Sequence, residues 1–173
     1  PISSNLYVKN LIPRDWRLGD MQDAQEFFLH IINKTKIQAI HNIFKFQTRE
    51  KVACFSDVCC DKDCSSKINQ ENILLLPLDE INIPNEIGFL LSQYLNYEAV
   101  DDYTCEKCHQ KGNVRKISEF LQVPLNLMIQ LKIYDSCGNK IDHIPISIDR
   151  LIQINGEYLD LCAIAVSYTH LRA

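Results

Sequence analysis

The sequence predicts an α+β protein in which one amphipathic helix precedes a strand-rich remainder. Apolar residues recur at helical spacing over residues 23–40, whereas several later stretches alternate between polar and apolar residues. The composition, with 46% hydrophobic and 23% charged residues, is that of a folded globular protein. Only 5 Gly and 6 Pro occur among 173 residues, so no low-complexity linker or internal repeat divides the chain.

Two stretches are expected to be helical. Asp23 and Glu26 resemble a capping box at the start of a helix over residues 23–40. Both carboxylates share one face of that helix, and on composition alone they are read as a helix cap. Residues 87–95, which follow Pro84, are expected to form a second, shorter helix.

Five stretches are expected to form strands, in a largely antiparallel arrangement. Residues 44–54 place polar and apolar side chains on opposite sides, and residues 73–78 are a short apolar run. The alternation is clearest over residues 125–134 and returns at residues 144–148. Residues 159–166 are apolar at almost every position, as in a strand that is covered on both faces.

Charge and cysteine content restrict the function. The formal net charge of -4 shows no basic excess, so nucleic acid is not an expected partner. No apolar run reaches the roughly 18 residues of a membrane span, and the N-terminus does not resemble a signal peptide. The 8 cysteines are too few for a disulfide scaffold and indicate reduced thiols, hence an intracellular protein of the cytoplasm or nucleus.

Two close cysteine pairs predict a structural zinc site. Three residues separate Cys60 from Cys64 and two separate Cys105 from Cys108, so the pairs can supply the four thiolates that tetrahedral zinc requires. Cys59 is an alternative to Cys60. The opposing interpretation is a set of unliganded thiols, although cysteines in polar turns are poor core residues.

The other cysteines are not expected to be catalytic. Cys54 and Cys162 lie in apolar strand patterns, where a thiol behaves as a small buried hydrophobe. Cys137 lies in a hairpin turn signal and is expected to be exposed.

The helix start resembles a known family. The segment Gln22-Asp23-Ala24-Gln25-Glu26-Phe27 is similar to the Gln-Asp-Ala-x-Glu-Phe helix start of ubiquitin-specific proteases. Later features follow in the family's order, and the resemblance covers about residues 21–166. These features are a strand, the Cys60/Cys64 turn, the apolar residues 73–78, Tyr94-x3-Glu98, Cys105-x2-Cys108, the Val123-Pro124 to Lys132 stretch, Lys140-Ile141 and residues 158–166.

The resemblance implies part of a papain-like cysteine protease fold, truncated at both ends. Residues 1–43 would belong to the thumb, residues 44–112 to zinc-bearing fingers and residues 113–166 to the palm. Residues 167–173 resemble a translated cloning adaptor. The parent protein would be a deubiquitinase that binds ubiquitin and hydrolyses the isopeptide bond after its C-terminal glycine.

The resemblance also implies residue roles. Asp23 and Glu26 would meet the basic tail of ubiquitin, Tyr134 would line the tail channel, and zinc would hold the fingers. No segment before Met21 is similar to the family's Gly-Asn-x-Cys nucleophile segment, and its Gly-His-Tyr loop is not found either, so this chain alone is expected to be inactive. Two alternatives stay open: a catalytically inactive ubiquitin-binding scaffold and an unrelated zinc-ribbon adaptor.

Overall fold

A computed structural model of the chain describes residues 12–13, 16–17, 23–35, 37–59, 63–79, 85–134, 137, 141 and 144–165. The chain divides into two compact units, one of Pro1–Asn42 with Cys162–Ala173 and one of Ile43–Leu161. All strands in the described part of the chain belong to the second unit.

Helix α2, Ala24–Thr35, is the main element of the first unit. It begins as expected but ends before residue 40, so the prediction of one continuous helix is wrong. The Thr35 hydroxyl donates to the carbonyl of Ile32 at 3.0 Å, and such local side-chain bonds compete with helix continuation. A separate helix, α3, Gln38–Phe44, follows.

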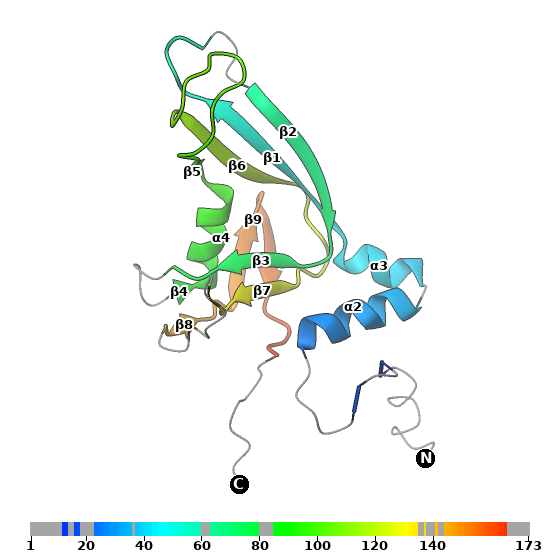
Figure 1. Cartoon of the computed structure of the whole chain (residues 1–173). Helices are drawn as coiled ribbons and strands as arrows, with labels where there is room; N and C mark the ends of the chain where they lie inside the picture. Colours follow the sequence, from blue (N-terminus) through cyan, green and yellow to red (C-terminus); the bar gives the residue numbers. More distant parts are fainter. Residues whose placement is uncertain are drawn as a thin grey trace, which may run out of the picture. The chain divides into compact units, whose positions relative to one another are not determined.

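The second unit contains an antiparallel sheet in the strand order β2-β1-β6-β5, drawn in Figure 1. Its central strand confirms the strand expected over residues 44–54: Phe46 and Thr48 are fully buried on one face, while Arg49 and Lys51 on the other face bind Glu119. The strands are β1, Phe46–Cys54; β2, Asp63–Glu71; β5, Glu98–Ala99; and β6, Val114–Gln122.

Strands β2 and β6 were not expected from the sequence. Most side chains of β2 are polar and exposed, including Ser65, Ser66 and Lys67, so the strand carries no apolar alternation. Its backbone pairs with β1 from Glu71 to Asp63. Backbone pairing to a neighbour, rather than burial of its own side chains, therefore makes this segment a strand.

Shorter elements surround the end of the sheet that holds Phe46 and Phe120. Strand β3 pairs in parallel with β7, β4 pairs in parallel with β8, and β9 forms an antiparallel hairpin with β10. Helix α4, Ile87–Leu95, confirms the second predicted helix. The strand bounds are β3, Leu74–Pro77; β4, Asn85–Glu86; β7, Ile129–Lys132; β8, Ile146–Ser147; β9, Leu151–Ile154; and β10, Glu157–Asp160.

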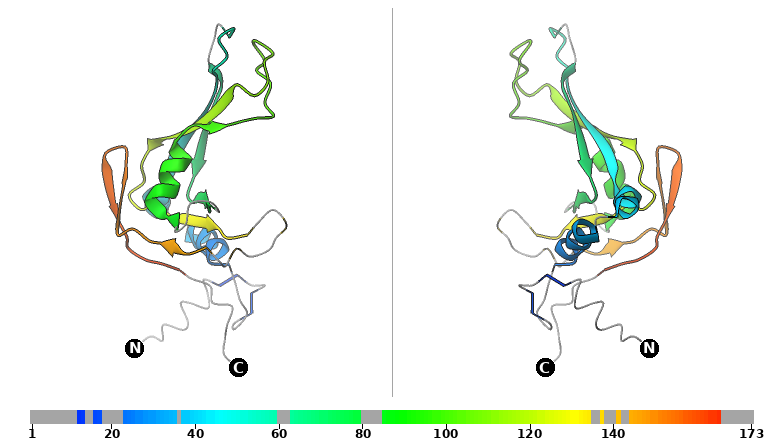
Figure 2. Two further views of the ribbon diagram at one scale, coloured as in Figure 1. Left: turned by 90° about the vertical axis from the view of Figure 1, so that its left-hand side faces the viewer. Right: turned by 90° about the vertical axis from the view of Figure 1, so that its right-hand side faces the viewer.

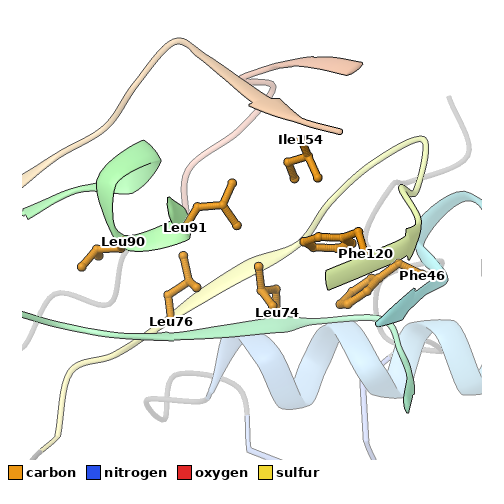
Figure 3. Close-up of a cluster of buried hydrophobic side chains, with 7 residues drawn as sticks. All are labelled: Phe46, Leu74, Leu76, Leu90, Leu91, Phe120 and Ile154. Carbon is orange, nitrogen blue, oxygen red and sulfur yellow. The ribbon is translucent and has the colours of Figure 1, made fainter. Parts of the chain in front are cut away.

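The main core joins these elements to the sheet. Figure 3 shows side chains from β1, β3, α4, β6 and β9 that point toward one another. The rings of Phe46 and Phe120 lie 5.4 Å apart between centroids in a tilted arrangement, which is favourable for aromatic pairs. The buried residues of this core are Phe46, Leu74, Leu76, Leu90, Leu91, Phe120 and Ile154.

Three predicted strands are shorter in the structure than in the sequence analysis. The strand expected over residues 125–134 is reduced to β7, and that over residues 144–148 to β8. The strand expected over residues 159–166 is wrong for residues 161–165, because β10 ends at Asp160, and residue 166 lies outside the described residues. Leu161 and Ile164 are 44% and 55% exposed, so this apolar run is not covered on both faces. An apolar sequence alone therefore does not make this segment a strand, although the N–H of Leu161 still donates to the carbonyl of Arg150 at 2.8 Å.

The observed class is α+β, as predicted. No helix in the described part of the chain is long and apolar enough to cross a membrane.

Candidate functional site

A cluster of cysteines lies at the end of the long sheet opposite the main core. Cys54 ends β1 and pairs in register with Val114, the first residue of β6. Two loops extend from this end: one follows β1, and the other, residues 100–113, precedes β6. Figure 1 and both views of Figure 2 show the two loops side by side. We call this region, residues 54–59 with residue 64 and residues 103–113, the tip.

Backbone hydrogen bonds hold the loop that carries Cys105 and Cys108 in a tight turn. The N–H of Cys105 donates to the carbonyl of Gln110 at 3.0 Å, and the N–H of His109 donates to the carbonyl of Cys105 at 2.8 Å. His109 adopts a φ of 57°, in the left-handed region that few residues other than glycine enter. The turn directs Cys105 inward, where it is fully buried, while His109 is exposed.

Four sulfur atoms meet at the tip. The Sγ atoms of Cys54, Cys59, Cys105 and Cys108 all lie within 4.8 Å of one another. The Sγ atoms of Cys54 and Cys108 are 3.7 Å apart, and those of Cys59 and Cys105 are 3.8 Å apart. A zinc ion with four thiolates at about 2.3 Å implies a sulfur-to-sulfur edge of about 3.8 Å. The donor set and its spacing therefore fit a tetrahedral metal such as zinc.

A fifth thiol borders this group. The Sγ of Cys64, on β2, lies 3.6 Å from the Sγ of Cys105. Cys60 lies outside the described residues, so the ligand set Cys60, Cys64, Cys105 and Cys108 stays a prediction. The structure does bring Cys64, Cys105 and Cys108 to the same tip, and it places Cys59, the alternative named from the sequence, among the four sulfurs.

The pKa values of two thiols at the tip, Cys105 and Cys64, are shifted in opposite directions. Backbone N–H groups of Cys108 and Lys107 bind the Cys105 sulfur and lower its pKa to about 6. Burial raises the pKa of Cys64 to about 11, and the negative charge of Cys105 adds to this effect. The turn that holds Cys105 thus stabilises a thiolate, which is the form that binds metals.

Sequence reasoning missed the part that Cys54 plays in the cluster. The alternation of β1 predicted that Cys54 is buried, and it is fully buried. Its proximity to Cys108 follows from the pairing of β1 with β6, which the sequence analysis did not predict. The spacing Cys54-x4-Cys59 is a signal in the sequence, although the strand alternation alone assigns Cys54 to the core.

Asp23 and Glu26 occupy different positions at the start of α2. The Oδ1 atom of Asp23 accepts hydrogen bonds from the backbone N–H groups of Gln25 at 2.6 Å and Glu26 at 3.2 Å. Asp23 is therefore a helix N-cap. The Glu26 side chain is exposed in the first turn.

The remaining predicted residues are on the surface. Tyr134 is 59% exposed, two residues beyond β7. Cys137 is exposed as expected. Cys162 is also exposed, which corrects the prediction that it is buried in a strand. The reason is that β10 ends at Asp160, before Cys162 is reached.

The fold was compared with known proteins. No protein-family model matches the sequence. One similar structure is the SAGA DUB module of a Ubp8 point variant with Sgf11, Sus1 and Sgf73, bound to monoubiquitin. A chain of this structure matches with a TM-score of 0.61 and 20% sequence identity. The match covers 76% of this chain and 32% of that chain. The same module bound to ubiquitin aldehyde gives a TM-score of 0.58 at 20% identity, with 76% of this chain and 32% of that chain covered.

A third similar structure is the yeast SAGA DUB module with an Sgf73 point mutant, with a TM-score of 0.55, 18% identity and coverage of 76% of this chain and 30% of that chain. This chain spans about a third of the length of the chains that it matches. It is thus a mixed α+β chain with a four-cysteine cluster, and its fold is similar to part of a SAGA DUB module that contains Ubp8.

Proposed function

We propose that this chain is the central part of a ubiquitin-specific protease domain in an intracellular protein. The observation that supports this most directly is the four-cysteine cluster at the tip of a long antiparallel sheet, in a fold similar to part of SAGA DUB modules bound to ubiquitin. In this proposal the sheet and its tip form zinc-bearing fingers that hold the body of ubiquitin.

The proposed zinc ligands are Cys54, Cys59, Cys105 and Cys108, because these four sulfurs have the spacing of a zinc tetrahedron. Zinc would join the loop after β1 to the loop before β6. Its role would be structural, since four thiolates leave no coordination position open for substrate or water.

The parent protein would hydrolyse the isopeptide bond after the C-terminal glycine of ubiquitin. A cysteine thiolate would attack the carbonyl carbon, and a histidine would take and return the proton. Neither group is assigned to this chain, whose part would be to bind ubiquitin. Glu26 and Tyr134, both exposed, are the proposed contacts for the ubiquitin tail, together with Asp23, which caps α2.

Titration of isotopically labelled ubiquitin with the zinc-loaded chain tests this proposal. We expect concentration-dependent changes in ubiquitin amide signals, both in the body and in the tail. If the chain binds zinc but leaves the ubiquitin spectrum unchanged, an unrelated zinc-ribbon adaptor becomes the better interpretation. In a parent protein that does bind ubiquitin, failure to react with a thiol-trapping ubiquitin probe favours an inactive scaffold.

A further inference from the structure

The tip brings together more thiols than one tetrahedral metal needs. Zinc takes four ligands in a structural site, whereas Cys64 is a fifth cysteine packed against the cluster. Its sulfur lies 3.6 Å from that of Cys105, and the sulfur of Cys59 lies 3.8 Å from the same atom. Both distances match the edge of about 3.8 Å expected for two thiolates on one zinc ion.

The backbone directs Cys64 toward this position. Ser65 pairs with Val52 and Asp63 pairs with Ala53, so Cys64 is the additional residue at a register shift between β1 and β2. Such bulges rotate a side chain out of the regular alternation and commonly occur where a strand must direct a residue to a site. Cys59 is held differently, in a short turn in which its N–H donates to the carbonyl of Ser56 at 3.1 Å.

We propose that Cys64 is a reserve ligand that replaces Cys59 at the zinc site. This inference rests on the zinc site of the proposed function. The site would then have two sets of four thiolates, which share Cys54, Cys105 and Cys108 and differ in Cys59 or Cys64. The turn that carries Cys59 can open to solvent in the second set while the metal remains bound to strands β1 and β2 and to the loop before β6.

Zinc affinity of the full chain tests this exchange, measured by competition with a chromophoric chelator. All variants carry Cys60→Ser, so that a thiol beside Cys59 does not substitute for it. We expect Cys59→Ser to weaken zinc binding by less than about tenfold and Cys64→Ser to change it by less than about threefold. The double variant Cys59→Ser/Cys64→Ser should weaken binding by more than about a hundredfold, well beyond the product of the single effects.

Cys108→Ser provides the matched control, because Cys108 belongs to both sets. Cys108→Ser should weaken zinc binding strongly whether or not Cys64 is present. The losses of zinc affinity from Cys108→Ser and Cys64→Ser should therefore be additive. Additive effects of Cys59→Ser and Cys64→Ser would overturn the proposal, as would a loss of zinc in Cys64→Ser or in Cys60→Ser alone. A starting chain that binds no zinc overturns the zinc site of the proposed function together with the exchange.

Thiol alkylation followed by mass spectrometry gives a second measurement, which does not need the double variant to fold. In the zinc-loaded Cys60→Ser chain, Cys64 should be alkylated before Cys59. In Cys59→Ser, zinc should protect Cys64 at least about tenfold compared with the chelator-treated sample. Equal reactivity of Cys64 in these two samples contradicts the reserve role, and the exposed Cys137 serves as the internal reference for reagent activity.

Discussion

Asp23 and Glu26 show how neighbouring carboxylates come to have different roles. The carboxylate of Asp23 accepts two backbone hydrogen bonds at the start of α2, so much of its interaction capacity is used within its own helix. The side chain of Glu26 is exposed in the first turn of the same helix. Glu26 is therefore a better candidate than Asp23 for a contact with a basic partner.

Glu26→Gln should therefore weaken ubiquitin binding without unfolding the helix. Removing one charge-assisted contact is expected to lower affinity by about tenfold or more, while the free energy of unfolding changes by less than ~1 kcal/mol. Calorimetry with intact ubiquitin, and with ubiquitin that lacks its basic tail, measures the effect. The variant should differ from wild type only when the tail is present. An equal loss with both forms of ubiquitin would place Glu26 outside the tail contact.

Asp23 variants separate capping from charge. Asp23→Ala should cost about 1 kcal/mol of stability because the N–H groups of Gln25 and Glu26 lose their acceptor. Asp23→Asn should cost less, since Asn is an equally good N-cap residue. Thermal unfolding of the two variants gives the comparison. If both lose stability equally, the charge of Asp23 matters more than its hydrogen bonds.

Strand β3 contains two neighbouring leucines, one buried and one exposed, that can be compared by substitution. Leu74 is 1% exposed within the main core, whereas its neighbour Leu75 is 42% exposed on the opposite face. Leu74→Ala is expected to lower the free energy of unfolding by about 2–5 kcal/mol through lost burial and a cavity, and Leu75→Ala by less than about 1 kcal/mol. Urea unfolding measures both. Similar losses would mean that the face of β3 is assigned wrongly.

The ion pairs between β1 and β6 predict a pH dependence. Glu119 accepts a hydrogen bond from its register partner Arg49 and lies 3.1 Å from the Lys51 ammonium nitrogen. The Arg49 contact holds the pKa of the Glu119 carboxyl below its ordinary value of 4.5. A carboxyl with a lowered folded-state pKa stabilises the protein above its unfolded pKa, and the stabilisation is lost as pH falls through the folded pKa.

Glu119→Gln should accordingly be less stable than wild type at pH 7, and the difference in the free energy of unfolding should be smaller at pH 3. The difference at pH 7 is expected to be at most ~1 kcal/mol, because the three side chains are each more than a third exposed and water screens the pairs. Urea unfolding at both pH values and at two salt concentrations provides the measurement. A difference of the same size at pH 3 and pH 7 would point to packing rather than charge.

The tip and the main core are separate clusters of buried residues. One contains Cys54, Cys59, Cys105 and Val114, and the other is the seven-residue core around Phe46 and Phe120. Because the two lie at opposite ends of the sheet, metal removal should affect them unequally.

A chelator should increase amide hydrogen exchange in residues 103–113 and around Cys59, with little change in β3 and α4. The proposed zinc site joins loops that have little other buried apolar contact, and structural zinc sites contribute directly to folding. Cys105→Ser should show the same pattern without chelator and no further change with it. Faster exchange across the main core as well would show that the metal supports the entire second unit.

The chain itself should not react with a ubiquitin probe that traps active-site thiols. Cys137 and Cys162 are the exposed thiols in the described part of the chain, and neither lies in a segment similar to the family's Gly-Asn-x-Cys nucleophile segment. Intact-mass measurement after incubation with the probe checks this. Rapid stoichiometric labelling of either cysteine would contradict the proposal that this chain binds ubiquitin without supplying the nucleophile.

The sequence alone determined the elements whose own side chains carry the signal. The alternation of residues 44–54 predicted β1 and the burial of Cys54, and the apolar residues 87–95 predicted α4. Local hydrogen-bonding preferences likewise identified Asp23 as the start of α2. These features depend on residues close in the chain, whose periodicity can be read directly.

Tertiary structure alone decided which distant residues meet. Strand β2 is polar and forms because β1 offers it a backbone edge, while residues 161–165 are apolar and yet lie outside any strand, since β10 ends at Asp160. The pairing of Cys54 with Val114 likewise brings the end of β1 to Cys108, which no local spacing encodes. Pairing between strands satisfies backbone groups whatever the side chains are, so strand partners, and the cysteines that they bring together, depend on contacts remote in sequence.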